Sequence, residues 1–178
     1  VTVGGTENLL MAAVLAEGRT VLRNAAREPE ITDLVAFLRG MGAEIEGEDT
    51  ATLVINGVSE LAASHYSVMP DRIEAGTFLV AAAATRGCIT VENAYAEHLG
   101  IVLEKLRDTG VDVTVEGNTI TADMTKGQLT SVDLITAPYP GFPTDMQAQF
   151  TALNVVAEGV GRITETIFEN RLMQAHEM

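Results

Sequence analysis

The stretch Met11-Ala12-Ala13-Val14-Leu15-Ala16-Glu17-Gly18 recurs in altered form at Val80–Gly87 and at Ala152–Gly159. Each copy is an alanine-rich apolar run that ends at a glycine, the residue that most often follows the C-terminus of a helix. A short run suited to a β-strand follows each glycine, at Thr20–Arg23, Ile89–Glu92 and Arg162–Glu165. This recurrence predicts a protein built from repeated units of helix and strand.

The first two copies continue into a shared second half. In both, Leu-Arg is followed by two variable residues, a glycine, a small residue, an acid and a β-branched residue, at Leu38–Ile45 and Leu106–Val113. A third copy would reach this point well past Met178, the last residue. Because each repeat buries its apolar face against its neighbours, we expect the chain to be part of a larger repeat protein.

Helices and strands alternate within each predicted unit. In the first unit we expect an extended segment at Val1–Val3, a loop at 4–6 and a helix over Glu7–Glu17. The second unit should begin with a strand at Tyr66–Met69 and a helix that Asp71 opens. Such alternation indicates an α/β or α+β fold in which helices cover sheets. The repeated helices are apolar nearly all round, which predicts that they are buried at the centre of each domain.

The first two units also contain a second helix and a hairpin. The apolar faces of these helices follow the spacing i, i+3, i+4, i+7 and consist of Ile31, Leu34, Val35 and Leu38, and of Leu99, Val102, Leu103 and Leu106. Hairpins are predicted at 43–56 and 111–122, the second around Gly117-Asn118. A domain boundary is expected between units, near 60–70 or 124–132.

The composition limits the partners of the chain. Lys and Arg number 11 against 25 Asp and Glu, a formal net charge of −14, so nucleic acid and anionic membrane surfaces are not expected as partners. A run of about 18 apolar residues is missing, so no membrane span is expected. One cysteine among 178 residues leaves no internal disulfide framework and fits a reducing, cytoplasmic compartment.

Common catalytic and metal-binding motifs do not occur in the sequence. There is no GxGxxG, GxxxxGK[ST], CxxC, HExxH or GxSxG. His65, His98 and His176 lack the spacing of metal ligands and are interpreted as surface residues. Cys88 follows a glycine at the start of a predicted strand and is interpreted as a buried structural thiol. Neither a metal nor a cofactor is therefore expected.

The segment 136–150 stands out as a candidate site. Three prolines and a glycine within 138–143 predict a rigid turn from a strand into a helix over Thr144–Glu158. Thr144 and Gln147 form a capping-box pattern, and Asp145 lies in the first turn, where free N–H groups and the helix dipole favour anions. An ordinary cap needs only the threonine and does not explain so rigid a placement of the carboxylate.

Three motifs carry a family resemblance, and they are PDRIEAGTF at 70–78, FPTDMQAQF at 142–150 and TETIFENR at 164–171. Val1–Gly4 and Ala25–Glu30 extend the match. Together they resemble the UDP-N-acetylglucosamine 1-carboxyvinyltransferase family, the enolpyruvyl transferases that begin bacterial peptidoglycan synthesis. The resemblance covers essentially the whole chain and less than half of the family's usual length.

The resemblance implies an enolpyruvyl transferase-like fold. Such a fold has two similar domains, each of three βαβαββ units around central helices, with the active site between the domains. Residues 1–69 would then form the last unit of the first domain. Residues 70–178 would form the first unit and part of the second unit of the second domain. The fold class is therefore expected to be α/β (α+β), and incomplete.

The resemblance also implies the residues that bind substrate. Val1, Thr2, Val3 and Gly4 match a strand-end segment that offers backbone groups and a hydroxyl to UDP-N-acetylglucosamine. Thr2 stands where serine is commoner in the family, and it keeps the hydroxyl. Ile167 matches a position, usually valine, that contacts the nucleotide sugar through its backbone.

Asp145 matches the family's catalytic carboxylate, which also binds the sugar at its 3-hydroxyl. In the implied reaction this hydroxyl attacks C2 of phosphoenolpyruvate while C3 takes a proton. The tetrahedral intermediate then expels phosphate and loses a C3 proton. A carboxylate within hydrogen-bond reach can accept the hydroxyl proton as attack proceeds. Glu28 and Arg171 match cleft residues with positioning roles.

The family's other catalytic groups fall outside this chain. They are a Lys-Asn pair, a mobile loop with the general-acid cysteine, and several arginines that bind phosphoenolpyruvate. Cys88 does not match that cysteine. The chain is therefore expected to be a portion of a cytoplasmic enzyme that is inactive alone. Its expected partners are UDP-N-acetylglucosamine, phosphoenolpyruvate and the missing portions of the same enzyme.

Two other functions compete with this interpretation. The shikimate-pathway enolpyruvyl transferase shares the fold, but 142–145 and 168–171 fit the sugar-nucleotide family better. A non-catalytic binding module built from the same repeats is the second alternative. A complete gene that retains the loop cysteine and the N-terminal lysine would exclude the module.

Overall fold

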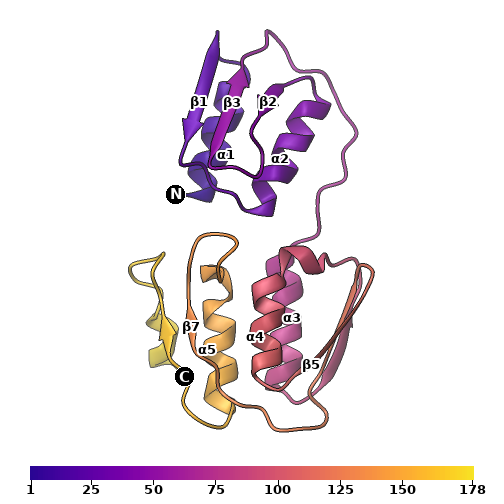
Figure 1. The fold of residues 1–178 in the computed structure, drawn as a ribbon, viewed down its shortest axis with the longest axis vertical. Coiled ribbons are helices and arrows are strands. Elements are labelled where there is room, and N and C mark those ends of the chain that lie inside the picture. Colours follow the sequence, from indigo (N-terminus) through magenta and orange to yellow (C-terminus); the bar gives the residue numbers. More distant parts are fainter. The chain divides into compact units, whose positions relative to one another are not determined.

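The computed structural model describes residues 1–178, and the chain divides into two units (Figure 1). Unit 1 comprises Val1–Met69 with Pro138–Pro140, and unit 2 comprises Pro70–Ala137 with Gly141–Met178. Each unit has its own cluster of buried hydrophobic side chains. None of the helices is both long enough and apolar enough to cross a membrane.

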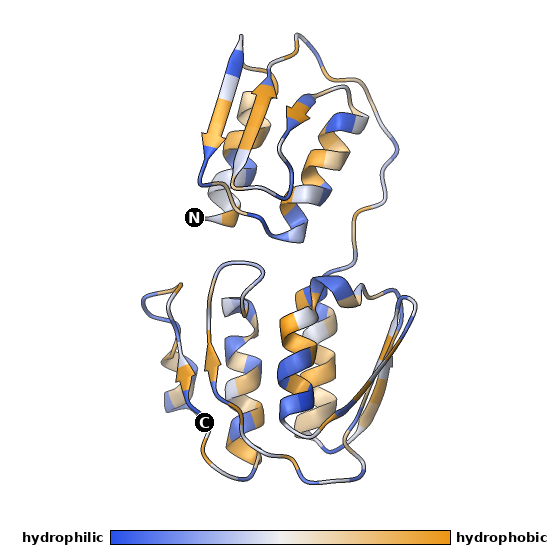
Figure 2. Ribbon diagram, in the orientation of Figure 1, coloured by the Kyte–Doolittle hydropathy of each residue, from blue (hydrophilic) through white to orange (hydrophobic).

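Unit 1 packs two helices against a three-stranded antiparallel sheet. Its elements are α1 (Val3–Ala13), β1 (Arg19–Arg23), α2 (Pro29–Gly40), β2 (Glu44–Glu46) and β3 (Thr52–Asn56). The strand order is β1-β3-β2. Side chains alternate between the two faces of a strand, so β3 buries Leu53 and Ile55 and leaves Thr52 and Asn56 exposed. Hydrophobic residues recur along β3 and α2 in Figure 2.

Unit 2 repeats this arrangement and then extends it. The repeated elements are α3 (Arg72–Ala84), β4 (Cys88–Val91), η1 (Ala96–His98), α4 (Gly100–Asp108), β5 (Asp112–Glu116) and β6 (Thr119–Asp123). Their antiparallel sheet has the order β4-β6-β5, which matches the order in unit 1. The predicted repeat, both hairpins and the mixed α/β class are therefore confirmed.

The extension of unit 2 carries the candidate site. It consists of β7 (Leu134–Ile135), η2 (Thr144–Met146), α5 (Gln147–Val156), β8 (Ile163–Thr164) and η3 (Met173–His176). β7 and β8 are parallel, with Leu134 opposite Ile163 and Ile135 opposite Thr164. Figure 1 shows α5 beside this short pair of strands.

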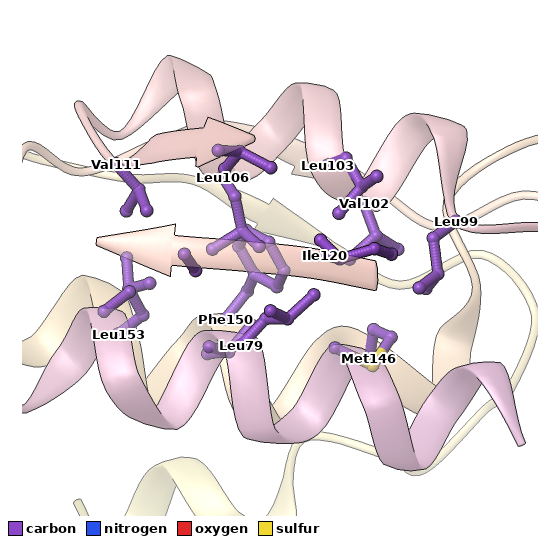
Figure 3. Close-up of a cluster of buried hydrophobic side chains, with 14 of the residues drawn as sticks. Leu79, Leu99, Val102, Leu103, Leu106, Val111, Ile120, Met146, Phe150 and Leu153 are labelled. Atoms are coloured by element: carbon purple, nitrogen blue, oxygen red, sulfur yellow. The ribbon is translucent and has the colours of Figure 1, made fainter. Parts of the chain in front are cut away.

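The core of unit 2 lies among α3, α4 and α5. In Figure 3 the side chains of Leu79, Leu106 and Phe150, one from each helix, point into one cluster. Gly76 on α3 faces Met146, and a Cβ built there would lie 3.0 Å from the Met146 Cε. Glycine at this position therefore lets η2 approach α3. Each of the four apolar positions predicted for the face of α4 is buried.

Helix α1 begins and ends earlier than the sequence predicts. Thr2, not a residue near position 6, is the N-cap, and Val3 and Gly4 already lie in the first turn. The helix stops at Ala13 because the chain at 57–58 crosses its end. There the Val58 N–H donates to the Val14 carbonyl at 2.8 Å. The predicted extended segment, loop and helix over 1–17 are wrong in these bounds.

Two other element predictions are wrong. Tyr66–Met69 is not a strand, because side-chain contacts rather than a sheet hold it: the Tyr66 hydroxyl and the Met69 N–H lie 2.9 and 3.2 Å from Asp33 Oδ1. The helix predicted over Thr144–Glu158 is instead a 3₁₀ turn followed by α5. It ends at Val156, since Glu158 bonds to the segment 129–131.

The sequence predicts that all the repeated helices are buried, but in the structure they are buried to different extents. α3 buries much of its surface, whereas α1 exposes Leu9 and Met11 and α5 exposes Val155 and Val156. Two single-residue interpretations also fail. Cys88 is exposed rather than buried, because it lies on the outward side of β4. His98 is half-buried, and its ring makes an edge contact with Tyr95.

Candidate active site

Asp145 lies at the start of the helical segment that follows the proline-rich turn. Its exposed carboxylate pairs with Arg171, with 2.7 Å between Asp145 Oδ1 and Arg171 Nη2. The second guanidinium nitrogen, Nη1, donates to Thr144 Oγ1 at 3.3 Å. The guanidinium also lies 5.4 Å from the centre of the Phe168 ring, a cation–π distance. Four contacting residues from 144–145 and 168–171 therefore meet at one point.

Thr144 does not act as the predicted helix cap. Its hydroxyl donates to Glu165 Oε2 at 2.8 Å, and neither η2 nor α5 has a side-chain cap. Gln147 is fully buried and bonds to Thr151 and Gln174 instead of closing a capping box. Thr144 thus ties the start of η2 to the segment after β8.

Glu165 gathers hydrogen bonds from three parts of the chain. Its Oε1 accepts from Thr136 Oγ1 at 2.8 Å, from the Ile167 N–H at 2.7 Å and from the Phe168 N–H at 3.0 Å. Burial by itself raises the pKa of the Glu165 carboxyl, but the hydrogen bonds from Thr136, the two N–H groups and Thr144 outweigh it. The net pKa of Glu165 is therefore lowered, and the group is held as a carboxylate.

A pocket of about 370 Å³ is lined by residues 165–172. Ile167 and Arg171 both belong to its wall, and Ile167 is partly exposed at 41%. Asp145 is joined to this wall through Arg171. The geometry places a carboxylate, a guanidinium and a length of backbone beside a hollow that a polar ligand can enter. Such a carboxylate can accept a proton from a bound hydroxyl.

The segment predicted to bind the nucleotide sugar lies in unit 1. Val1, Thr2 and Gly4 are exposed and Val3 is half-buried. The segment is the start of α1 and not the end of a strand, which corrects that part of the expectation. The Thr2 hydroxyl accepts from the Gly5 N–H at 3.4 Å. First-turn N–H groups of a helix have no partner within the helix, so this end offers donors to an anion.

A buried threonine connects this helix start to the segment before α2. The Thr6 hydroxyl donates to the Thr2 carbonyl at 2.8 Å and accepts from the Ala26 N–H at 3.0 Å. Glu28 follows two residues later, is half-buried, and accepts from the Arg27 N–H at 3.0 Å. Unit 1 thus brings the start of α1 and the strand-to-helix segment near Glu28 into one connected group.

The sequence pointed to Asp145, Arg171 and Thr144. It did not point to the carboxylate of Glu165 or to the hydroxyls of Thr6 and Thr136. Thr136 lies in the segment 136–150 and Glu165 in the motif 164–171, but the two residues are about 30 positions apart in sequence, so no local pattern relates them. In the fold, no group of three or more His, Cys, Asp or Glu is arranged to hold a metal ion.

The chain is similar to known proteins along its whole length. The family model described as EPSP synthase (3-phosphoshikimate 1-carboxyvinyltransferase) matches residues 1–178. The UDP-N-acetylglucosamine 1-carboxyvinyltransferases of Hydrogenovibrio crunogenus and Cellvibrio japonicus are each 60% identical to this chain over all 178 residues. That of Coxiella burnetii is 57% identical over the same span.

The chain spans only about two fifths of these relatives, 43%, 42% and 41% of their respective lengths. Among solved structures, the enolpyruvyl transferase NikO from Streptomyces tendae is similar with a TM-score of 0.83 and 27% identity. The similarity covers 98% of this chain and 42% of the NikO chain. The fold described above is thus that of part of an enolpyruvyl transferase.

Proposed function

Because this chain belongs to the EPSP synthase (3-phosphoshikimate 1-carboxyvinyltransferase) family, we propose that it is part of an enolpyruvyl transferase acting on UDP-N-acetylglucosamine. The enzyme would transfer the enolpyruvyl group of phosphoenolpyruvate to the 3-hydroxyl of the sugar and release phosphate. The observation that carries this proposal is the 57–60% identity, across the full chain, to relatives with that name.

In this proposal Asp145 is the catalytic carboxylate and binds the sugar's 3-hydroxyl. Its ion pair with Arg171 supports the role, because the guanidinium fixes the carboxylate in one orientation at the edge of the 165–172 pocket. A carboxylate is a far weaker base than an alkoxide, so a free alkoxide would not form at neutral pH. It would therefore accept the proton while the hydroxyl attacks C2, and would contribute mainly through orientation.

Contacts to the nucleotide sugar are proposed for two segments of the chain. We propose that Val1, Thr2, Val3 and Gly4 offer the Thr2 hydroxyl and first-turn N–H groups to the UDP portion, and that Ile167 contributes its backbone. Residues 1–69 would complete the first domain of the enzyme, and residues 70–178 would begin the second. Two similar units with the same strand order support this division.

The chain on its own would not catalyse the reaction. The family's lysine, loop cysteine and phosphoenolpyruvate-binding arginines match no residue here, so these groups would come from the remainder of the enzyme. Neither a cofactor nor a metal is needed in the proposed reaction. A cytoplasmic location and a role in peptidoglycan synthesis, and through it in cell-wall biogenesis, cell shape, the cell cycle and division, belong to the same proposal.

The description of the matching family model favours one competing function, transfer to shikimate 3-phosphate. Against it, relatives at 57–60% identity carry the sugar-nucleotide name. Calorimetry on an enzyme of full family length that carries these 178 residues, the full-length enzyme, would separate the two. We expect heat of binding with UDP-N-acetylglucosamine and none with shikimate 3-phosphate. The reverse result would overturn the proposal, and binding of neither ligand would favour a non-catalytic module.

A further inference from the structure

The side chain of Glu165 joins three segments of unit 2 through hydrogen bonds. Its two carboxylate oxygens accept four hydrogen bonds, from Thr136 at the end of β7, Thr144 at the start of η2, and the Ile167 and Phe168 N–H groups after β8. Thr136 is itself fully buried, and its hydroxyl also accepts from the Thr166 N–H at 2.8 Å. The three segments therefore share one anionic centre.

One half of this network fixes the backbone around Ile167. Three donors converge on Oε1, and two of them are the N–H groups two and three residues further along the chain. These bonds set the turn that leads into the 165–172 pocket. The orientation of the Ile167 peptide in the pocket wall thus depends on an acceptor at Oε1.

The other half acts on Asp145 through Thr144. A hydroxyl has one hydrogen, and Thr144 gives it to Glu165 Oε2. Its lone pairs are then free to accept from Arg171 Nη1, while Nη2 of the same planar guanidinium reaches Asp145. The acceptor at Oε2 therefore orients a hydroxyl, the hydroxyl orients a guanidinium, and the guanidinium orients the carboxylate.

We propose that Glu165 is a positioning residue for enolpyruvyl transfer, which holds Asp145 through Thr144 and Arg171 and holds the Ile167 backbone directly. The inference rests on the proposed function, because it takes Asp145 and Ile167 as the groups to be positioned. In this proposal Glu165 acts through these groups and not on a substrate. Its two oxygens serve different steps: Oε2 serves the chemical step through Asp145, and Oε1 serves sugar-nucleotide binding through Ile167.

Two substitutions separate these two roles. In Glu165→Gln the amide oxygen is expected to face the three donors at the Oε1 position, since the amide nitrogen cannot accept from them. The nitrogen then faces Thr144, and it donates to the hydroxyl instead of accepting from it. Glu165→Ala removes both acceptors. Only the alanine variant should therefore disturb the Ile167 backbone.

The test is steady-state kinetics of the full-length enzyme with both substrates. Glu165→Gln should lower kcat by about 10- to 100-fold, as expected when a reacting group is misplaced by a fraction of an ångström to one ångström, with KM for UDP-N-acetylglucosamine within about threefold. Glu165→Ala should lower kcat similarly and raise that KM by about tenfold or more. Thr144→Val, which removes the hydroxyl and keeps the shape, should reproduce the kcat loss of Glu165→Gln.

Asp133→Asn is the matched control. Asp133 Oδ1 accepts from the Arg162 N–H at 2.7 Å and so ties the same two segments together at the opposite end of β7 and β8. Asp133→Asn should leave kcat within twofold of the wild-type value. Equal kcat losses in Asp133→Asn and Glu165→Gln, or unchanged kcat in Glu165→Gln and Thr144→Val, would overturn the inference. A wild-type enzyme without transferase activity would instead overturn the proposed function, so the two failures are distinguishable.

Discussion

The start of α1 and the network around Asp145 are the two candidate binding regions, and they are built differently. The start of α1 offers backbone N–H groups and one hydroxyl, and Thr2 forms hydrogen bonds with Gly5 and Thr6 of the same helix. The network in unit 2 joins two carboxylates, one guanidinium and two threonines. Backbone groups suit recognition of a ligand, whereas a fixed carboxylate suits proton transfer. We therefore expect changes at the start of α1 to alter affinity and changes at Asp145 to alter turnover.

The largest effect should follow the loss of proton-accepting ability in unit 2. Asp145→Asn keeps the size of the side chain and one acceptor for Arg171, but it cannot take the hydroxyl proton. In the full-length enzyme kcat should fall by about 10²- to 10⁴-fold, the usual contribution of a positioned base. Affinity for UDP-N-acetylglucosamine, measured by calorimetry, should stay within a few-fold.

Asp108→Asn controls for the loss of an exposed ion pair. Asp108 pairs with Lys105 at 3.0 Å, a distance close to the 2.7 Å between Asp145 and Arg171. Asp108→Asn should not change turnover. Equal turnover in wild type and Asp145→Asn would mean that Asp145 only begins the helical segment and takes no part in the reaction.

A smaller effect, and on a different parameter, is expected in unit 1. Thr2→Ala removes the hydroxyl that is proposed to meet the UDP portion. One hydrogen bond contributes about 0.5–1.5 kcal/mol, so KM for UDP-N-acetylglucosamine should rise by about 2- to 10-fold with little change in kcat. Thr2→Ser keeps the hydroxyl and should behave as the wild type. A fall in kcat with unchanged KM in Thr2→Ala would contradict the division between recognition and chemistry.

The unit 2 network should also respond to pH. The pKa of Glu165 is lowered in the folded state, so its ionised form stabilises the fold above the pKa of an unfolded glutamate, about 4.3. This stabilisation is lost as the pH falls through the lower folded pKa. The Tm difference between wild type and Glu165→Gln, measured by calorimetric melting, should therefore be larger at pH 7 than near pH 3. A difference that is constant over this range would show that the charge of Glu165 does not stabilise the network.

The smallest effect is expected outside both regions. Cys88 is exposed at the start of β4, opposite Asp123 in the sheet. Cys88→Ala removes neither a hydrogen-bond partner of the network nor a group of the α1 segment. Turnover should stay within twofold and Tm within about one degree. Loss of turnover in a folded Cys88→Ala enzyme would mean that the thiol takes part in the reaction.

The sequence predicted those parts of the fold that depend on local pattern. Both hairpins, the buried face of α4 and the Asp71 cap, which accepts from the Ile73 and Glu74 N–H groups, follow from residues close together in the chain. The sequence did not predict the ends of α1 and α5, because segments far away in sequence form hydrogen bonds with the residues there. Glycines at positions 4 and 5 favour a loop by propensity, yet the Thr6 bonds to Thr2 and Ala26 hold them in a helix.

The same difference between local pattern and long-range contact applies to the candidate site. Asp145 and Arg171 were found by their motifs, but their pairing needs the crossing from η2 to the segment after β8. Glu165 was missed because its role is defined by donors at 136 and 144, which periodicity cannot relate to it. The burial of the repeated helices was overestimated for α1 and α5, since a sequence pattern does not say how many neighbouring repeats are present to cover them.

The most direct test is phosphate release by the full-length enzyme supplied with phosphoenolpyruvate and UDP-N-acetylglucosamine. We predict one phosphate for each enolpyruvyl sugar nucleotide formed, with none released when either substrate is omitted. The 178-residue chain alone should release none above background. Phosphate release that requires shikimate 3-phosphate in place of the sugar nucleotide, or release by the isolated 178-residue chain, would contradict the proposed function.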